Sequence, residues 1–425
     1  MLRLQSYLQD KWVSGAGTPR QLVNPATEAV IAETTTKGLD YAAALAYARD
    51  VGGPALRSMT FAERGALLKA MSRALYEKRE ELLSLSTACN GATRGDSKFD
   101  VDGAMGTLSA YARIGAELGD GRHLIDGEAD RLSSGARYVG QHVRVPRPGV
   151  AVQINAFNFP AWGTFEKIAP AFLAGVPVLT KPATATAPLT YRMIQIIVAA
   201  DILPPGALSF VAGSAGDLLD HLGPQDLIAF TGSADTAAVL RSGAGVRERS
   251  VRMNVEADSL NAAVLAPDVA PNDPVWHAFV RAVMTDMRQK TGQKCTAIRR
   301  VFIPRDRVDD VVESLKAEMA QIVVGDPSLK EVTMGPVATA SQLRDCREGI
   351  AFLAEQADIL AGGADPVAGV GVDGGKGYFV APTLLLARDA ASADRVHHRE
   401  VFGPVVTLLP YDGQAETASA LVALG

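Results

Sequence analysis

The sequence has few cysteines and no long hydrophobic run. Its three cysteines, Cys89, Cys295 and Cys346, lie far apart in 425 residues. This spacing suits a reducing compartment better than a disulfide framework, and it lacks the paired cysteines of a structural zinc site. No apolar stretch approaches the ~18 residues of a membrane span, and the sequence contains no recognisable secretory signal. We therefore expect a globular protein of the cytoplasm that does not bind membranes.

Charge of neither sign dominates. The 42 basic and 47 acidic residues give a net charge of −5 and are spread through the chain, which argues against a nucleic-acid patch. His397 and His398 are adjacent and therefore point in different directions, so we expect no metal site there. With 48% hydrophobic residues, a chain of this length buries large cores and forms two or more domains.

Short apolar strands alternate with helices from Gly149 onward. We predict strands over residues 150–154, 176–180, 207–211, 226–230 and 253–255, and a helix over 164–174 that ends at Gly175. Strands separated by ~10–15-residue helices indicate βαβ units and a parallel sheet with helices on both faces. The fold class is therefore α/β.

Three other regions have patterns of their own. Helical periodicity dominates residues 61–118, whereas residues 137–148 alternate apolar and polar side chains and then meet Pro146 and Pro148, which predicts an exposed β-arm. A second α/β series begins near Asn261, with helices over 275–289 and 308–323 and a strand over 300–303. Residues 369–374 fit G-x-G-x-x-G, but no strand precedes them and no helix follows, so we predict a flexible loop and not a dinucleotide fingerprint.

Cys295 lies in the segment Thr-Gly-Gln-Lys-Cys-Thr-Ala, between the helix over 275–289 and an apolar strand. Gly292 permits a tight turn after the helix, so the loop could present the thiol at a cleft. A thiol with the reference pKa of ~8.5 is only a few per cent thiolate at neutral pH, so a nucleophilic role needs a polarising pocket. For an isolated cysteine, a buried structural role is the commoner one.

Four further groups end predicted strands. Asn158 follows the first strand, Lys181 and the Phe230–Ser233 segment end two others, and Glu256 ends the last. In a doubly wound sheet this edge is where ligands bind. The Asn158 amide could donate to an oxyanion or make an Asx turn, and Glu256 could be a base or a structural carboxylate.

The same residues belong to an ordered series of motifs. The series is Asn158-Phe159-Pro160, Lys181-Pro182-Ala183, Phe230-Thr231-Gly232-Ser233, Glu256, Gly292-Gln293-x-Cys295 and Glu400-Val401-Phe402-Gly403-Pro404. It resembles the aldehyde dehydrogenase superfamily over essentially the whole chain from about Gln5. More narrowly, segments 154–160, 181–187, 213–220 and 256–261 resemble the PaaZ-type branch of phenylacetate catabolism and the related semialdehyde dehydrogenase of the benzoyl-coenzyme A pathway.

The resemblance implies a fold and a site. It implies a parallel-sheet cofactor domain over residues 1–258, with a projecting arm at about 137–148, and an α/β catalytic domain over 259–425. It implies that Cys295 is the nucleophile, that Asn158 is its oxyanion partner and that Glu256 is the general base. It further implies a set of cofactor-binding residues: Lys181, Thr184, Gly213, Phe230, Gly232, Ser233, Glu400 and Phe402.

Two positions depart from the commoner family pattern. Thr184 stands where the family often has a glutamate that contacts the adenosine ribose, and a carboxylate there would repel a 2′-phosphate. We therefore favour NADP over NAD as the cofactor, with NAD as the alternative. Ala257-Asp258-Ser259 replaces the usual Leu-Gly-Gly after Glu256. Asp258 could raise the pKa of Glu256, or it could hydrogen-bond the backbone of its own turn.

The chain ends at Gly425 within a predicted helix over 416–424, whereas family members continue further. We therefore expect a chain truncated at its C-terminus and, for a complete chain, a homodimer. No hot-dog hydratase domain is present, so ring-opening activity is not predicted.

The resulting prediction is NADP-dependent oxidation of an aldehyde, taken as a coenzyme A-linked semialdehyde of aromatic ring catabolism, to a carboxylic acid. The route runs through a cysteine thiohemiacetal and a thioester. The alternatives are a coenzyme A-acylating aldehyde dehydrogenase and a catalytically silent, truncated binding protein.

Overall fold

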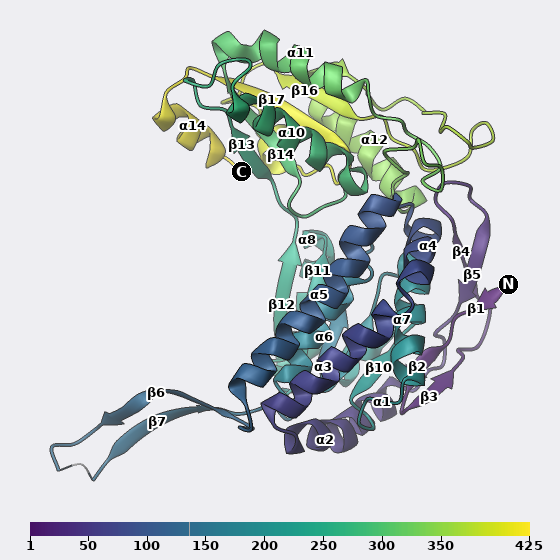
Figure 1. Cartoon of the computed structure of the whole chain (residues 1–425), viewed down its shortest axis with the longest axis vertical. Coiled ribbons are helices and arrows are strands. Elements are labelled where there is room, and N and C mark those ends of the chain that lie inside the picture. Colours follow the sequence, from purple (N-terminus) through teal and green to yellow (C-terminus); the bar gives the residue numbers. More distant parts are fainter. Residues whose placement is uncertain (136) are drawn as a thin grey trace. The chain divides into compact units, whose positions relative to one another are not determined.

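The computed structural model describes residues 1–135 and 137–425 (Figure 1). By its internal contacts the chain divides into two compact units. The first unit comprises Met1–Leu22, Ala32–Leu82 and Lys98–Ala257, and the second comprises Val23–Ile31, Leu83–Ser97 and Asp258–Gly425. The main division after Ala257 lies next to the boundary expected from the sequence, but two N-terminal segments belong to the second unit.

A seven-stranded sheet forms the centre of the first unit, in the order β12-β11-β8-β9-β10-β2-β3. Its five parallel strands are β8 (Ala151–Ile154), β9 (Val178–Lys181), β10 (Leu208–Phe210), β11 (Leu227–Gly232) and β12 (Arg252–Ala257). Taken in chain order they lie as 5-4-1-2-3, which is the strand order of the doubly wound dinucleotide-binding fold. Antiparallel strands β2 (Ser6–Leu8) and β3 (Lys11–Val13) extend one edge. The predicted parallel sheet is confirmed.

Helices of the first unit cover this sheet, whose strands β8, β9 and β10 are almost entirely buried. The unit's helices are α1 (Tyr41–Tyr47), α2 (Gly53–Ser58), α3 (Phe61–Tyr76), most of α5 (Arg94–Leu118), α6 (Trp162–Leu173), α7 (Ala187–Ala199), α8 (Ala234–Ser242) and α9 (Ala244–Arg249). Helix α3 packs on α6 and α7, and it begins at a capping box in which Thr60 and Glu63 satisfy each other's backbone N–H groups. Helix α6 ends before Gly175, which has the expected left-handed φ of +74°.

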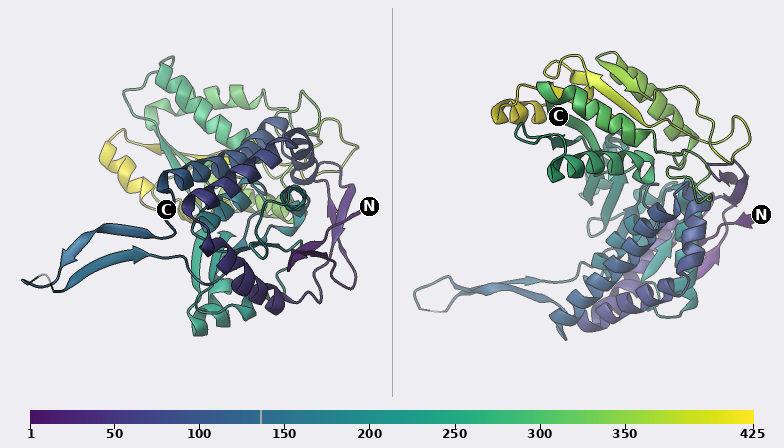
Figure 2. Two further views of the ribbon diagram at one scale, coloured as in Figure 1. Left: turned by 60° about the horizontal axis from the view of Figure 1, so that its bottom comes forward. Right: turned by 45° about the horizontal axis from the view of Figure 1, so that its top comes forward.

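The N-terminal part also forms a small sheet and an arm. Strands β1 (Leu2–Arg3), β5 (Val30–Thr34) and β4 (Arg20–Val23) make the small sheet. The arm is an antiparallel pair, β6 (Leu124–Arg131) and β7 (Val139–Arg144), which projects from its own unit in Figures 1 and 2. Strand β7 confirms the arm predicted at 137–148. The sequence did not indicate β6, because Gly127 and the acidic residues interrupt its alternation.

The second unit contains a five-stranded sheet in the order β13-β14-β17-β16-β15 (Figure 2). The strands are β13 (Asn261–Val264), β14 (Ile298–Pro304), β15 (Ala357–Ala361), β16 (Thr383–Ala387) and β17 (Val405–Tyr411), of which only β15 is antiparallel. The helices are α10 (Pro274–Arg288), α11 (Val308–Met319), α12 (Ala340–Ala354), α13 (Asp394–His398) and α14 (Ala415–Val422). Helix α4 (Arg79–Asn90) lies across the division of the chain.

Strand alternation gives the second unit a core on each face of its sheet. Val301 and Ile303 of β14 pack with the apolar stripe of α10, whereas Phe302 packs with α12 on the opposite face. The helix predicted over 275–289 is confirmed. Residues 369–374 form a loop with a bridge at Val370, and no helix follows, as predicted. Among the described residues, no helix has both the length and the apolarity that a bilayer span requires.

Candidate active site

The carboxyl ends of the first unit's parallel strands meet at one edge. Ile154 pairs with both Lys181 and Phe230, and Thr231 pairs with Glu256. The sequence-predicted residues that end these strands therefore share that edge. It includes the switch point between β8 and β11, where ligands bind in open α/β sheets.

Asn158 lies in a loop after β8 that is fixed by buried hydrogen bonds. The loop begins at Asn155, whose backbone N–H donates to Lys181 O at 3.0 Å and whose Nδ2 donates to Thr180 Oγ1 at 3.0 Å. The loop ends at Pro160, whose carbonyl accepts from the Thr190 hydroxyl at 2.8 Å. The Asn158 side chain is itself buried. A side chain held by such a loop is pre-organised for donation.

Asp100 of α5 stabilises the other side of this loop. Its carboxylate accepts from Trp162 N at 2.8 Å, at the start of α6, where unpaired N–H groups favour an anion. The ring of Phe159, next to Asn158, stands edge-on to Trp162 with 6.0 Å between ring centroids. Sequence reasoning missed Asp100 because no local pattern relates residues that lie 62 positions apart.

Glu256 projects from β12 with its carboxylate exposed. Thr231 of the neighbouring strand donates its hydroxyl to Glu256 Oε2 at 3.2 Å, which orients the carboxylate without covering it. A general base that acts on water needs such access.

Lys181 lies largely buried at the end of β9. Burial lowers the pKa of Lys181 to about 8, and repulsion by Arg20 of β4 adds to the shift. An anion bound beside this ammonium would offset both effects. Arg20 was not predicted from the sequence, since it lies in a distant segment of the chain.

Two glycines at this edge lie so close to neighbouring side chains that a Cβ would not fit. A Cβ at Gly232 would lie 2.5 Å from the Phe230 ring, and one at Gly213 would lie 2.8 Å from the Thr36 methyl group. Ser233 caps α8 by accepting from Thr236 N at 3.3 Å. With Thr184 opening the short helical turn Thr184–Thr186 before α7, these features fit a dinucleotide phosphate and ribose.

In the second unit, Cys295 is exposed on the loop between α10 and β14, after the buried Lys294 and before the exposed Thr296. Three successive residues before it, Lys290, Thr291 and Gly292, have left-handed φ angles of 55°, 56° and 69°. This turn lies directly after the end of α10 at Arg288. A Cβ at Gly292 would overlap the carbonyl of Gly403, so glycine is required there.

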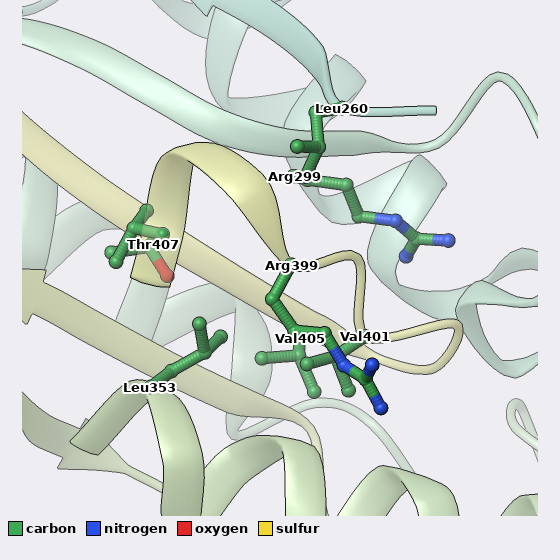
Figure 3. Close-up of a pocket in the computed structure, with 8 residues that line it drawn as sticks. Leu260, Arg299, Leu353, Arg399, Val401, Val405 and Thr407 are labelled. Atoms are coloured by element: carbon green, nitrogen blue, oxygen red, sulfur yellow. The ribbon is translucent and has the colours of Figure 1, made fainter. Parts of the chain in front are cut away.

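Arg299 of β14 is a buried guanidinium at the centre of this region, and Figure 3 shows it beside a small cavity. It donates to Gly292 O at 2.8 Å, Gly403 O at 2.8 Å and Glu400 Oε1 at 3.1 Å. Burial raises the pKa of Glu400, and the Arg299 charge opposes that rise. Sequence reasoning missed Arg299, whose partner Glu400 lies 101 residues further along the chain.

Glu400 and Phe402, predicted to bind cofactor, adjoin Arg299. The second carboxylate oxygen of Glu400 accepts from Ser259 N at 3.2 Å, and the Phe402 ring centroid lies 5.5 Å from the guanidinium carbon. Both oxygens of Glu400 therefore already accept hydrogen bonds within the second unit.

The segment after Glu256 contacts the Cys295 loop. The Ser259 hydroxyl and Asn261 Nδ2 both donate to the carbonyl of Cys295, the latter at 2.7 Å. Asp258 has a left-handed φ of 47°, and its charge is among those that raise the pKa of Glu400. An effect of Asp258 on the Glu256 pKa stays a prediction.

The cavity in Figure 3 is too small for a substrate. Its volume of about 10 Å³ suffices for roughly one water molecule. It is lined by Leu260, Arg299, Leu353, Val396, Arg399, Val401, Val405 and Thr407.

The sequence is similar to known proteins over nearly its whole length. The Aldehyde dehydrogenase family matches residues 12–421. The 3,4-dehydroadipyl-CoA semialdehyde dehydrogenase of Aromatoleum evansii is 45% identical over 420 residues, covering 99% of this chain and 81% of the relative. The alpha-ketoglutaric semialdehyde dehydrogenase of Bacillus subtilis is 28% identical, covering 97% of this chain and 81% of the relative.

Solved structures have the same fold. The betaine aldehyde dehydrogenase of Staphylococcus aureus, crystallised with NAD+, aligns with a TM-score of 0.87 and 23% identity, covering 100% of this chain and 81% of that one. The family match over nearly the whole sequence and the 45% identical relative together establish that the chain belongs to the aldehyde dehydrogenase family, whose members are oxidoreductases.

Proposed function

We propose that this aldehyde dehydrogenase oxidises a coenzyme A-linked semialdehyde from aromatic ring catabolism to the carboxylic acid, with NADP as the oxidant. The observation that carries the proposal is the exposed Cys295 thiol on a loop whose flanking carbonyls are held by side chains. The substrate class is supported by the 45% identical relative, which is named for a coenzyme A-linked semialdehyde. Further relatives are also named for semialdehydes.

In the first step the Cys295 thiolate adds to the aldehyde carbon. The carbon–sulfur bond forms as the carbonyl π electrons move to oxygen. The Asn158 amide and the Cys295 backbone N–H donate to that oxyanion, and one such donor is typically worth ~3–4 kcal/mol. The rigid loop around Asn158 supports this role, because a pre-positioned donor loses little freedom in the transition state.

When bound, the nicotinamide cofactor supplies a hydride acceptor that turns the thiohemiacetal into a thioester. We assign its binding to the residues that the family resemblance implies. They are Lys181, Thr184, Gly213, Phe230, Gly232 and Ser233 at the edge of the first sheet, with Glu400 and Phe402 in the second unit.

In the last step Glu256 removes a proton from water, and the resulting hydroxide attacks the thioester carbon. The carbon–sulfur bond then breaks, which releases the acid and regenerates the thiolate. The exposed carboxylate, oriented by Thr231, supports this role. In the alternative, an acylating dehydrogenase, a coenzyme A thiolate resolves the thioester and no such base is needed.

The identity of the product tests the proposal. The full chain is incubated with NADP and either a coenzyme A-linked semialdehyde or the same aldehyde without coenzyme A, and products are identified by mass spectrometry. We expect faster NADP reduction with the linked substrate and a free carboxylate at its oxidised end. A new thioester at that end would replace this function by the acylating one, and no reduction with either aldehyde would favour the silent binder.

The cofactor preference predicts the effect of a charge at position 184. We expect Thr184→Glu to raise the KM for NADP about 10- to 100-fold, because a carboxylate a few ångströms from the 2′-phosphate repels it. The KM for NAD, which lacks that phosphate, should change less than threefold on the same argument. Initial rates with both cofactors measure the change, and Thr184→Gln is the uncharged control. Equal losses for the two cofactors would contradict the assignment.

The arm supports a proposed homodimer. Among its side chains Ile125, Tyr138, Val139 and Val143 are exposed, and such residues favour pairing with a second copy. Sedimentation of the chain with and without Val143→Lys checks this arrangement.

A further inference from the structure

We propose that Arg299 is a positioning residue that fixes the direction of the Cys295 backbone N–H and thiol. The inference rests on the proposed nucleophilic role of Cys295. The buried guanidinium of Arg299 holds the loop on one side of the thiol, and Ser259 and Asn261 hold it on the other; we call these three side chains the clamp.

The contacts of Arg299 fix the loop before the thiol. Besides Gly292 O, its Nη2 donates to Lys294 O at 3.2 Å. The carbonyl of Lys294 and the N–H of Cys295 belong to one planar peptide unit, so fixing the carbonyl fixes the direction of that N–H. The proposed oxyanion donor is therefore aimed by a side chain that does not itself touch the substrate.

The backbone conformation shows why such a clamp is needed. Lys290 and Thr291 have left-handed φ angles that are disfavoured for residues with a side chain. These conformations persist only where the surroundings determine them. Thr291 Oγ1 donates to Gly335 O at 2.9 Å, and Arg299 holds the carbonyl of Gly292, so the turn is fixed at two successive residues.

Contacts after the thiol complete the clamp. Asn261 Nδ2 donates to both Cys295 O at 2.7 Å and Ala297 O at 3.1 Å, and the Ser259 hydroxyl also donates to Cys295 O. Carbonyls on both sides of the thiol are thus held by side chains.

Arg299 also joins this loop to the segment assigned to the cofactor. The same guanidinium donates to Gly403 O and to Glu400 Oε1, and Glu400 Oε2 accepts from Ser259 N. One oxygen of the Glu400 carboxylate therefore accepts from Arg299, and the other accepts from the backbone of Ser259 on the opposite side of the clamp. The planar guanidinium reaches four acceptors at once, which the single ammonium of lysine cannot reproduce.

The test compares Arg299→Lys with Arg300→Lys in the full chain. Arg300 is the matched control, since it is also buried on β14 and donates to carbonyls, but to those of Leu260, Val422 and Gly425. We expect Arg299→Lys to lower kcat about 10- to 100-fold with KM changed less than threefold, by analogy with loss of an oxyanion donor. The pH dependence of the rate at which iodoacetamide alkylates Cys295 should also change in this variant. Arg300→Lys should lower the melting temperature and leave the alkylation profile unchanged.

Two outcomes overturn the inference. One is an Arg299→Lys protein with wild-type kcat and an unchanged alkylation profile, and the other is an equal change of profile in Arg300→Lys. If Arg299→Lys does not fold, Asn261→Ala removes the clamp from the other side and must show the same two effects. Full activity of Cys295→Ala would defeat the proposed function, whereas an intact alkylation profile in Arg299→Lys would defeat this inference alone.

Discussion

Replacement of Cys295 by alanine is expected to lower kcat for aldehyde oxidation by about 10⁴-fold or more, because no other nucleophile takes its part in the covalent step. The side chain is exposed, so the free energy of unfolding should change by less than about 0.5 kcal/mol. Absorbance of the reduced cofactor measures the rate, and thermal unfolding measures the stability.

Cys89→Ala serves as the matched control for the loss of a thiol. Cys89 is buried in α4, so its replacement should lower the melting temperature and leave the activity of the folded fraction intact. If Cys295→Ala kept more than a few per cent of wild-type turnover, the thiol could not be the nucleophile. Unchanged cofactor affinity in this variant, measured by fluorescence titration, would show that only the chemical step was lost.

The first unit's sheet was predictable because most of its parallel strands are short apolar runs that stop at a polar residue. Lys181 and Glu256 mark two such ends, and the βαβ rule then places both at one edge. The thiol loop was predictable for a similar local reason, since the helix before it has a clear apolar stripe and Gly292 follows its end.

Residues whose partners lie far along the chain were not predictable. Asp100 caps a helix that starts 62 residues later. Arg20, which lies in another sheet, lowers the pKa of Lys181 by charge repulsion. The segment 23–31 joins the second unit through a hydrogen bond from Tyr378 N to Pro25 O at 2.9 Å. Local periodicity carries no information about such pairs. A single sequence therefore indicates candidate chemical groups better than it indicates the contacts that hold them.

Glu256→Gln is expected to lower steady-state turnover by about 10²- to 10⁴-fold, the usual effect of losing a general base, while sparing the first oxidation. The amide cannot take a proton from water, so the thioester on Cys295 should accumulate. Rapid-mixing absorbance should show a burst of reduced cofactor close to one equivalent per thiol, followed by a slow phase. Glu248→Gln is the control, because Glu248 is an exposed carboxylate of α9 that pairs with its neighbour Arg247.

The stalled variant also separates hydrolysis from acyl transfer. If Glu256 serves hydrolysis alone, added coenzyme A attacks the accumulated thioester directly and restores turnover, with an acyl-coenzyme A as the product, provided that the thiol reaches the acyl group. If the Glu256→Gln protein showed no burst of reduced cofactor, Glu256 would act before oxidation, for example by deprotonating Cys295. Normal turnover without added thiol would remove Glu256 from the mechanism, and the exposed carboxylate beside Thr231 would then be structural.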